Sequence, residues 1–509
     1  MPIFPYLYAV NLSEFLRRWE RDPLPWIMFL ALLVRLPAML FSRGYGMYDD
    51  HFLVVEPAQH WLDGIPMWLT GPEPEKKSLV YPGFFYLLYG LLERLGVFDP
   101  ELKSLVGRIV HGLFSLLTVF YSYKIARRLG SVKAATLAAM LVACLWFMPF
   151  MSVRFLVEAV VLPFVLAGTW FALRAVDDDR PGLWLAAGLL MGLSFAVRYQ
   201  TVLIIGGTGL ALLFLKRWRG AFFFGLGGAM GIFLLQGLVD VYFWKIPFSP
   251  LYYYYKYNVE HAADYPVLPW YNYLLLFAGV FVPPLSLFLL FGTLVDWRKN
   301  LILFLPTLLF FAVHSYHINK QERFVLTVVP QVLILGAVGW EKFRAGSDFW
   351  NARPKLFPKI MAVVWSLNFI VLAPLSVSSS KLHAVDTMRY LGAKPENERY
   401  AVIFDSYKKS RIFVPDFYMG KNKRLPVQIE FRDYETPEAL QNRLGALTDS
   451  VYYVLVFQDV DVPLREERLK TIFPALRREA VIEPALLDKV MYFLNPINLN
   501  QTVYIYRTR

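Results

Sequence analysis

The sequence predicts a mainly α-helical protein that crosses a membrane many times and carries a small C-terminal α/β domain. Of 509 residues, 57% are hydrophobic and 18% are charged, whereas a soluble domain has about 25% charged residues. Long apolar runs recur from residue 26 to residue 377. These runs are continuous and do not alternate, which indicates membrane-spanning helices and disfavours a transmembrane β-barrel. After residue 378 the apolar runs become short.

The first predicted span covers residues 26–41. Residues 1–24 contain a short basic amphipathic stretch, which we place on the cytoplasmic surface. No small-residue cleavage site follows the apolar run, so we expect an uncleaved first span. Arg35 lies inside this span. An arginine at this depth either has a function or packs against the helix bundle.

Ten further apolar runs predict a total of about eleven crossings. They cover residues 104–126, 133–150, 153–175, 182–198, 200–216, 219–243, 271–292, 300–317, 324–340 and 357–377. The run 81–98 is apolar but short. It forms either a full span or a helix that only dips into the membrane.

The distribution of Lys and Arg decides between these two readings. If residues 81–98 do not cross, the basic loops near residues 124–133, 216–219, 298–299 and 342–359 all face one side. Cytoplasmic loops are enriched in Lys and Arg, so we assign that side to the cytoplasm and treat 81–98 as a dipping helix. The net charge of +12 is explained in the same way and does not predict a nucleic-acid partner.

Residues 379–509 predict a separate extracytoplasmic α/β domain, and residues 1–378 a transmembrane domain whose first outer loop covers 43–102. Four runs rich in Val, Ile and Tyr predict strands, and two further stretches predict helices. The strands are AVIFDS, LPVQIEF, VYYVLVFQD and TVYIYRT, and the helices are TPEALQNRLGAL and LREERLKTIF.

The first outer loop is acidic, with an adjacent pair at Asp49 and Asp50 and a third carboxylate at Glu56. Transfer of a sugar to a hydroxyl needs a base near the acceptor. Two adjacent residues cannot point the same way in a helix or a strand, so one of the pair faces the site. Alternatively, the pair is solvated and has no role, because such pairs are common.

Cations also gather on the predicted outer side. Arg198 interrupts an apolar helical hairpin, and Lys320 and Arg323 begin a span at its outer end. A lipid-linked sugar phosphate needs positive charge at the headgroup level. These residues therefore bind a phosphate or anchor the protein at the interface.

Other polar features carry weaker signals. His314 and His317 have the spacing of a helix face, but no carboxylate or Cys is spaced to complete a metal site with them. The aromatic loop 244–270 suits either a sugar ring or the membrane interface. Cys144 is the single cysteine, so no disulfide can form within the chain.

Six stretches in order resemble family 22 of the GT-C glycosyltransferases, the lumenal mannosyltransferases of N-glycan and GPI-anchor assembly. The resemblance covers most of residues 25–345. The six stretches are YDDHFLVVEP, KSLVYPGFFYLL, MSVRFLVEA, GLLMGLSFAVRYQ, VDVYFWKIPFSP with its continuation to LPWYNYLL, and HSYHINKQERFVLTVVP. The family has Asp-Glu where this chain has Asp49 and Asp50. Asn319 and Gln321 depart from its His and Glu, which favours a prokaryotic relative.

The resemblance implies an inverting transfer from a polyprenyl-phosphate sugar. We expect no cofactor, and we assign no metal ligands, while metal dependence stays open. The family's base is the acidic residue of the first outer loop, which matches Asp49, with Asp50 as its neighbour. Arg198, Lys320 and Arg323 match positions suited to the donor phosphate. Further substrate-binding candidates at matching positions are Glu56, Arg154, Asp240, Asn258, His314 and Glu322.

We therefore expect an integral membrane glycosyltransferase that moves mannose or another hexose to a lipid-linked glycan or other acceptor on the non-cytoplasmic face. Its membrane would be that of a bacterial or archaeal cell, or the endoplasmic reticulum of a eukaryote. The main alternative is a flippase or transporter of lipid-linked sugars. A transporter favours polar sites at the midplane and paired repeats, neither of which the sequence shows. A structural module whose soluble tail binds partners would leave the outward acids unexplained.

Overall fold

The computed structural model describes most of the chain in two compact units. The described residues are 22–70, 74, 76–264, 267–407, 412, 414–495 and 502–509, without the side chains of Asp50 and Ala263. The first unit comprises Met1–Leu36, Gly112–Ser152 and Val157–Ala373, and the second comprises Pro37–His111, Val153–Leu156 and Pro374–Arg509. The basic stretch predicted near the N-terminus falls on residues outside the described part. The domain boundary at residue 378 stays a prediction.

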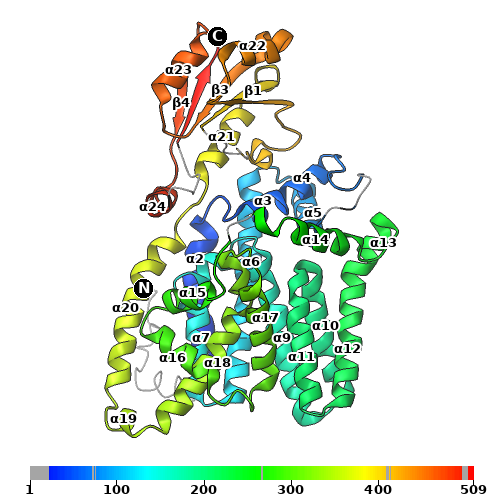
Figure 1. Ribbon diagram of the computed structural model, residues 1–509, viewed down its shortest axis with the longest axis vertical. Helices are drawn as coiled ribbons and strands as arrows, with labels where there is room; N and C mark the ends of the chain where they lie inside the picture. Colours follow the sequence, from blue (N-terminus) through cyan, green and yellow to red (C-terminus); the bar gives the residue numbers. More distant parts are fainter. Residues whose placement is uncertain are drawn as a thin grey trace, which may run out of the picture. The chain divides into compact units, whose positions relative to one another are not determined.

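The predicted helical membrane protein is confirmed, because each predicted span contains an apolar helix (Figure 1). Within the described residues, six helices are long and apolar enough to cross a membrane: Leu24–Phe41 (α2), Pro100–Leu129 (α6), Val157–Asp178 (α9), Trp218–Trp244 (α12 to α13), Glu322–Ala345 (η4 to α18) and Leu356–Ser376 (α20). Shorter apolar helices are Val132–Cys144 (α7), Pro181–Val197 (α10), Tyr199–Phe214 (η1 to α11), Leu285–Leu294 (α16) and Leu301–Tyr316 (α17). The number of crossings stays a prediction.

Two predicted elements differ from the structure. The span expected at 271–292 is broken into α15 (Asn272–Val280) and α16, because Pro283 and Pro284 lie between them and proline cannot continue a helix. The segment 244–270, expected to be a loop, contains the helix α14 (Ser249–Glu260). The Tyr-rich composition obscured this helix, since aromatic residues have lower helix propensity than straight-chain ones.

In the first unit, α10 packs closely against α9 and α12. A Cβ added at Gly188 of α10 would lie 1.9 Å from the carbonyl oxygen of Phe224 in α12. Small residues let helix backbones approach each other in a membrane, where no hydrophobic effect drives helices together. The close α10–α12 contact therefore depends on glycine.

We expect Gly188→Ala to destabilise the first unit by about 1–3 kcal/mol, the usual effect of overpacking. Gly206→Ala in α11 is the matched control, because nothing lies within 4 Å of its added Cβ. Thermal unfolding in detergent should show a lower midpoint for Gly188→Ala than for Gly206→Ala. Equal midpoints would contradict the close packing of α10 and α12.

Arg35 of α2 is buried and acts as a cap on α7. Its guanidinium donates to the carbonyls of Ala143 (2.9 Å) and Val142 (3.3 Å), and its Nε donates to Ser115 Oγ (2.9 Å). The last carbonyls of a helix lack partners within the helix and attract positive charge. Of the two readings of this arginine, the structure favours packing.

The second unit contains the first loop and the C-terminal sheet. Its N-terminal part holds α3 (Tyr48–Phe52), α4 (Val55–Leu62), α5 (Val80–Arg94) and the start of α6. Its C-terminal part holds α21 (Leu382–Gly392), β1 (Ala401–Ser406), β2 (Val427–Arg432), α22 (Pro437–Leu444), β3 (Val451–Phe457), α23 (Val462–Lys470), β4 (Arg477–Ile482), α24 (Leu486–Leu494) and β5 (Val503–Arg507). The four predicted strands and two predicted helices of this region are present, while α21, β4 and α24 were not expected.

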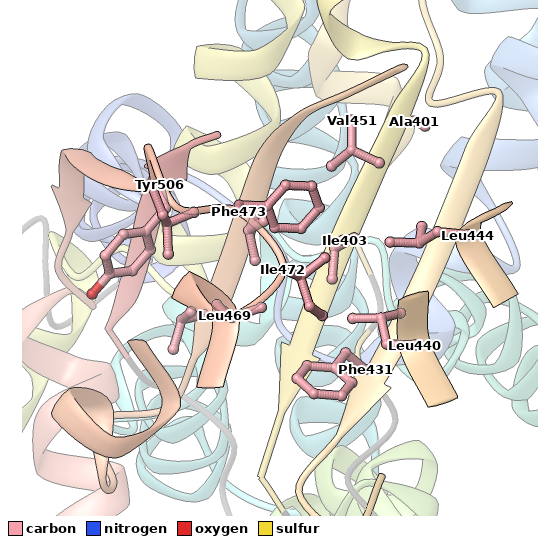
Figure 2. Packing of buried hydrophobic residues seen from close by; sticks show 13 residues of the cluster. Ala401, Ile403, Phe431, Leu440, Leu444, Val451, Leu469, Ile472, Phe473 and Tyr506 are labelled. Atoms are coloured by element: carbon pink, nitrogen blue, oxygen red, sulfur yellow. The ribbon is translucent and has the colours of Figure 1, made fainter. Parts of the chain in front are cut away.

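The sheet has the order β2-β1-β3-β5-β4. Strands β2, β1 and β3 are parallel, and β5 pairs antiparallel with both β3 and β4. Leu440 and Leu444 of α22 and Leu469 of α23 pack with Ile403 and Phe431 of the sheet, as Figure 2 shows. Helices that follow β2 and β3 in the chain therefore cover the sheet.

Candidate functional site

The acidic first loop is organised around His51, which is buried in the second unit. Its ring stacks on Tyr45 (centroids 4.9 Å apart) and on Tyr418 (5.3 Å). Its Nε2 lies 2.9 Å from Glu56 Oε1. His51 thus fixes the short helix α3, which carries the Asp49–Asp50 pair, against α4 and the C-terminal segment.

Glu56, at the start of α4, joins the loop to the C-terminal region. Both of its carboxylate oxygens accept the backbone N–H of Phe417, at 3.1 and 3.2 Å. Its side chain is buried, and one oxygen also faces His60 at 3.8 Å. These contacts occupy the carboxylate of Glu56 and hold the loop in place. A contact between Glu56 and the substrate stays a prediction.

Asp49 lies on a different face of α3 from His51. Successive helical residues are rotated by about 100°, so residue 49 is about 160° from residue 51 around the axis. The structure agrees with this estimate, since His51 is buried whereas Asp49 is only half-buried. Asp49 is therefore turned away from His51, and its role as the base stays a prediction. The side chain of Asp50 lies outside the described part.

A second polar network ties the loop to residues 421–424. Glu93 of α5 pairs with the buried Lys103 (2.6 Å) and with Lys421 (2.7 Å). Asp63 accepts from the guanidinium of Arg424 at 3.4 Å. The two networks show why the loop and the C-terminal region form one compact unit.

Asp416, next to Phe417, makes this junction sensitive to pH. Burial, and then the charge of Glu56, raise its pKa to about 7. Because the folded-state pKa exceeds the usual value of about 3.9, protonated Asp416 favours the folded junction. This contribution is complete below about pH 4 and is lost as the pH rises through about 7.

We expect Asp416→Asn to remove this pH dependence from the stability of the C-terminal region. Protease protection of that region, followed from about pH 5 to about pH 8 in wild type and variant, is a direct measurement. Wild type should lose protection as the pH rises, relative to Asp416→Asn. Parallel pH profiles would show that the carboxyl group has no such effect.

Arg154, a predicted substrate-binding residue, is buried and bonded to backbone oxygens. Its guanidinium donates to the carbonyls of Arg43 (3.3 Å), Gly44 (3.1 Å) and Ser378 (3.3 Å) and to Ser42 Oγ (2.8 Å). These contacts fix the start of the first loop to the segment after α20. A role in binding substrate stays a prediction.

In the first unit, Arg198 pairs with Glu158. The guanidinium Nη1 is in direct contact with Glu158 Oε1, and both side chains are buried. Nη2 donates to the carbonyl of Phe324 at 3.1 Å. Arg198 lies where α10 ends and η1 (Tyr199–Thr201) begins, so the break in the hairpin places a cation inside the helix bundle.

Arg198, His314 and Arg323 share two aromatic rings. The guanidinium of Arg198 is 5.9 Å from the ring centroids of Phe310 and Phe324, and that of Arg323 is 5.7 Å from Phe324. The ring of His314 stacks on Phe310 at 4.0 Å, and its Nδ1 donates to the Phe310 carbonyl (2.8 Å). We call these five residues the Arg198 cluster. Two of the predicted donor-phosphate residues therefore come together here.

Lys320, the third predicted phosphate residue, is buried and holds an irregular segment. Its Nζ donates to the carbonyls of Leu268 (2.8 Å) and His317 (2.5 Å). Non-helical backbone beside a membrane span must find hydrogen-bond partners within the protein, and the Nζ of Lys320 supplies one for each of these two carbonyls. Glu322, two residues later, is exposed.

Asp240 and Asn258 support α14. Asp240 accepts from Gln236 Nε2 (2.8 Å) and from the backbone N–H of Phe248 (3.1 Å), which has a left-handed φ of 62°. Asn258 Nδ2 donates to the carbonyl of Tyr254 (2.8 Å). Both residues shape this helix, and direct contact with a substrate stays a prediction.

Several structural partners were not predicted from the sequence. His51, Phe417 and Tyr418 are far apart in sequence or belong to the C-terminal region, and no spacing signal links them. Glu158 matches a family motif position, but its pairing with Arg198 was not predicted, although an acid in an apolar span needs a cationic partner. Among the described residues, no group of three or more His, Cys, Asp or Glu side chains is placed to hold a metal ion.

Comparison with known proteins decides the family. The model of the Alg9-like mannosyltransferase family matches residues 26–406. The chain belongs to this family. The predicted resemblance to lumenal mannosyltransferases is thereby confirmed, and the protein is a multi-pass membrane glycosyltransferase.

Individual relatives agree with the family match. Mannosyltransferase APTG1 of Arabidopsis thaliana is 24% identical over 504 residues, which cover 89% of this chain and 88% of that protein. The Dol-P-Man:Man(7)GlcNAc(2)-PP-Dol alpha-1,6-mannosyltransferase of the same organism is 27% identical, with coverage of 72% and 71%.

Solved structures share the fold at low sequence identity. ArnT from Cupriavidus metallidurans, bound to undecaprenyl phosphate, matches with a TM-score of 0.57 at 13% identity, covering 95% of this chain and 97% of that one. The oligosaccharyltransferase AglB from Archaeoglobus fulgidus, with an inhibitory peptide and a dolichol-phosphate, matches with a TM-score of 0.54 at 12% identity, covering 89% and 71%. The chain therefore shares the helical GT-C architecture with these enzymes.

Proposed function

We propose that this glycosyltransferase transfers a hexose, with mannose favoured, from a polyprenyl-phosphate sugar to a lipid-linked glycan, with inversion and on the non-cytoplasmic face. The observation that carries the proposal is the Arg198 cluster. In it, the buried guanidinium groups of Arg198 and Arg323, both at positions that match family motifs, lie over the same ring, that of Phe324. A buried guanidinium at the end of a membrane span suits a lipid-linked phosphate, to which it can donate two hydrogen bonds. The donor class also follows the names of the relatives above.

Asp49 is the proposed base. Its carboxylate takes the proton of the acceptor hydroxyl, and the acceptor oxygen forms a bond to the anomeric carbon of the sugar. The bond between that carbon and the phosphate oxygen breaks, and polyprenyl phosphate leaves with the bonding electrons. The charge that develops on the phosphate is then stabilised by cations.

Arg198 and Arg323 are the proposed phosphate ligands, and the role of Lys320 is positioning. The Nζ of Lys320 already bonds two backbone carbonyls, so it holds the segment that leads to Arg323. Gln321 Oε1 accepts from Arg323 Nε at 2.9 Å. At position 321 the family has a glutamate, whereas this chain has the neutral Gln321. The hydrogen bond from Arg323 to Gln321 therefore orients the guanidinium without neutralising the positive charge of Arg323.

A donor panel tests the proposal. The purified protein, in vesicles that contain a lipid extract as acceptor, would be given undecaprenyl-phosphate mannose, dolichyl-phosphate mannose, the matching glucose donors and GDP-mannose. We expect a labelled lipid-linked product with a polyprenyl-phosphate sugar and none with GDP-mannose. Product with GDP-mannose alone would overturn the donor class. Movement of lipid-linked sugar across the bilayer without transfer would favour the transporter.

A further inference from the structure

The helix α24 (Leu486–Leu494) exposes large apolar side chains that are not part of the hydrophobic core of the sheet. The exposed fractions are 78% for Leu486, 85% for Phe493 and 70% for Leu494, whereas Asp488 is 1% exposed. In Figure 1, α24 is drawn in dark red, apart from the C-terminal sheet. Single exposed apolar residues are ordinary, but several on one short helix mark an interaction surface.

The four most exposed apolar residues of α24 form a stripe, whereas Met491 and Tyr492, which are 42% and 38% exposed, lie off it. Leu486, Val490, Phe493 and Leu494 have the spacing i, i+4, i+7 and i+8, which places them on one face of a helix. Asp488 is rotated by about 200° from Leu486, so it lies on the opposite face. Helix α24 is therefore amphipathic, with its buried acid directed away from the apolar stripe.

Asp488 fixes α24 to the segment that follows α20. Its carboxylate accepts the backbone N–H of Lys381 at 2.8 Å and faces Ser380 Oγ at 3.5 Å. The backbone N–H of Ser380 in turn donates to the carbonyl of Arg43 at 3.0 Å. These residues all belong to the second unit.

The anchor point is close to the ends of two predicted spans. Arg43 is two residues after the end of α2, and Ser380 is four residues after the end of α20. Two extended residues reach about 7 Å at most. The headgroup region on each side of a bilayer is about 5–8 Å thick, so Asp488 is held at the level of the membrane surface.

We propose that α24 is an interfacial helix whose apolar stripe inserts into the membrane that α2 and α20 cross. Amphipathic helices bury such a face at the boundary between headgroups and acyl chains. Lys489 lies beside the stripe with an exposed side chain, paired with Glu483, and a lysine there can extend toward the headgroups. The C-terminal domain is thus attached to the bilayer by α24 as well as by its connection to α20.

Spin labels on the full-length protein test this inference. The chain has one native cysteine, so a single substitution removes background labelling. Cys144 is buried and would be replaced by alanine. Phe493→Cys reports on the stripe, and Leu464→Cys is the matched control, since Leu464 of α23 is a 59% exposed leucine on the same domain. Both variants would be labelled in vesicles of phosphatidylcholine with phosphatidylglycerol.

The expected result is opposite reagent access at the two positions. The label at 493 should collide more with oxygen, which concentrates in lipid, and the label at 464 more with a water-soluble nickel chelate. Equal nickel access at both positions would overturn the inference in favour of a water-exposed helix. Shielding of position 493 from both reagents would also overturn it, and dipolar broadening between labels would then identify a second copy of the chain as the occupant.

Discussion

Replacing Asp49 with asparagine is expected to lower the rate of sugar transfer by about 100- to 10,000-fold, the usual contribution of a general base. Asparagine keeps the size of the side chain but cannot accept a proton. Asp49 is half-buried and lies away from the buried His51, so the fold should tolerate the change. Initial rates with a polyprenyl-phosphate sugar, together with the thermal midpoint, provide the measurement.

The neighbouring variant Asp50→Asn separates the two acids. If Asp49 is the base, Asp50→Asn should retain much more activity than Asp49→Asn at the same expression level. The reverse order would move the base to Asp50. Full activity in both variants, with intact protein, would contradict a catalytic role for the acidic pair.

Removing Glu158 is expected to destabilise the first unit by about 3–5 kcal/mol, because the buried Arg198 would lose its counter-charge. Both side chains are buried, and the pair is a direct contact. We expect Glu158→Ala to unfold at a lower temperature in detergent and to yield less folded protein. An unchanged thermal midpoint would show that Arg198 does not depend on this carboxylate.

The double variant Glu158→Ala with Arg198→Met separates the stability of the pair from its chemistry. It removes both charges and fills the space with an apolar side chain, so much of the lost stability should return. If Arg198 binds the donor phosphate, the double variant should be folded but have a raised KM for the donor. Recovery of both stability and activity would make Arg198 a purely structural residue.

The architecture could be predicted because apolar runs and strand patterns are local signals. Every predicted span contains a helix, and the strands from AVIFDS to TVYIYRT are present. The failures are also local in origin. Two prolines break the span predicted at 271–292, because the length of an apolar run does not reveal where a backbone bends. The many tyrosines hid helix α14, because aromatic residues have a lower helix propensity than straight-chain ones.

The site could be predicted only in part, since partners depend on tertiary structure. The motif matches marked Arg198, Arg323 and Phe324, but not that both guanidinium groups lie over the ring of Phe324. The sequence offered no sign that Glu56 accepts the N–H of Phe417, which lies 361 residues further along the chain. Arg154 is the opposite case. Its match to a family motif predicted substrate binding, but in the structure its guanidinium donates to backbone carbonyls.

The anomeric configuration of the product tests the central claim most directly. A single displacement, with Asp49 as base and the phosphate as leaving group, must invert the configuration at the anomeric carbon. The purified protein would be given a polyprenyl-phosphate mannose of defined β configuration, and the new linkage would be assigned by nuclear magnetic resonance. We predict an α linkage. A β linkage would require a covalent sugar–enzyme intermediate and would contradict the role proposed for Asp49.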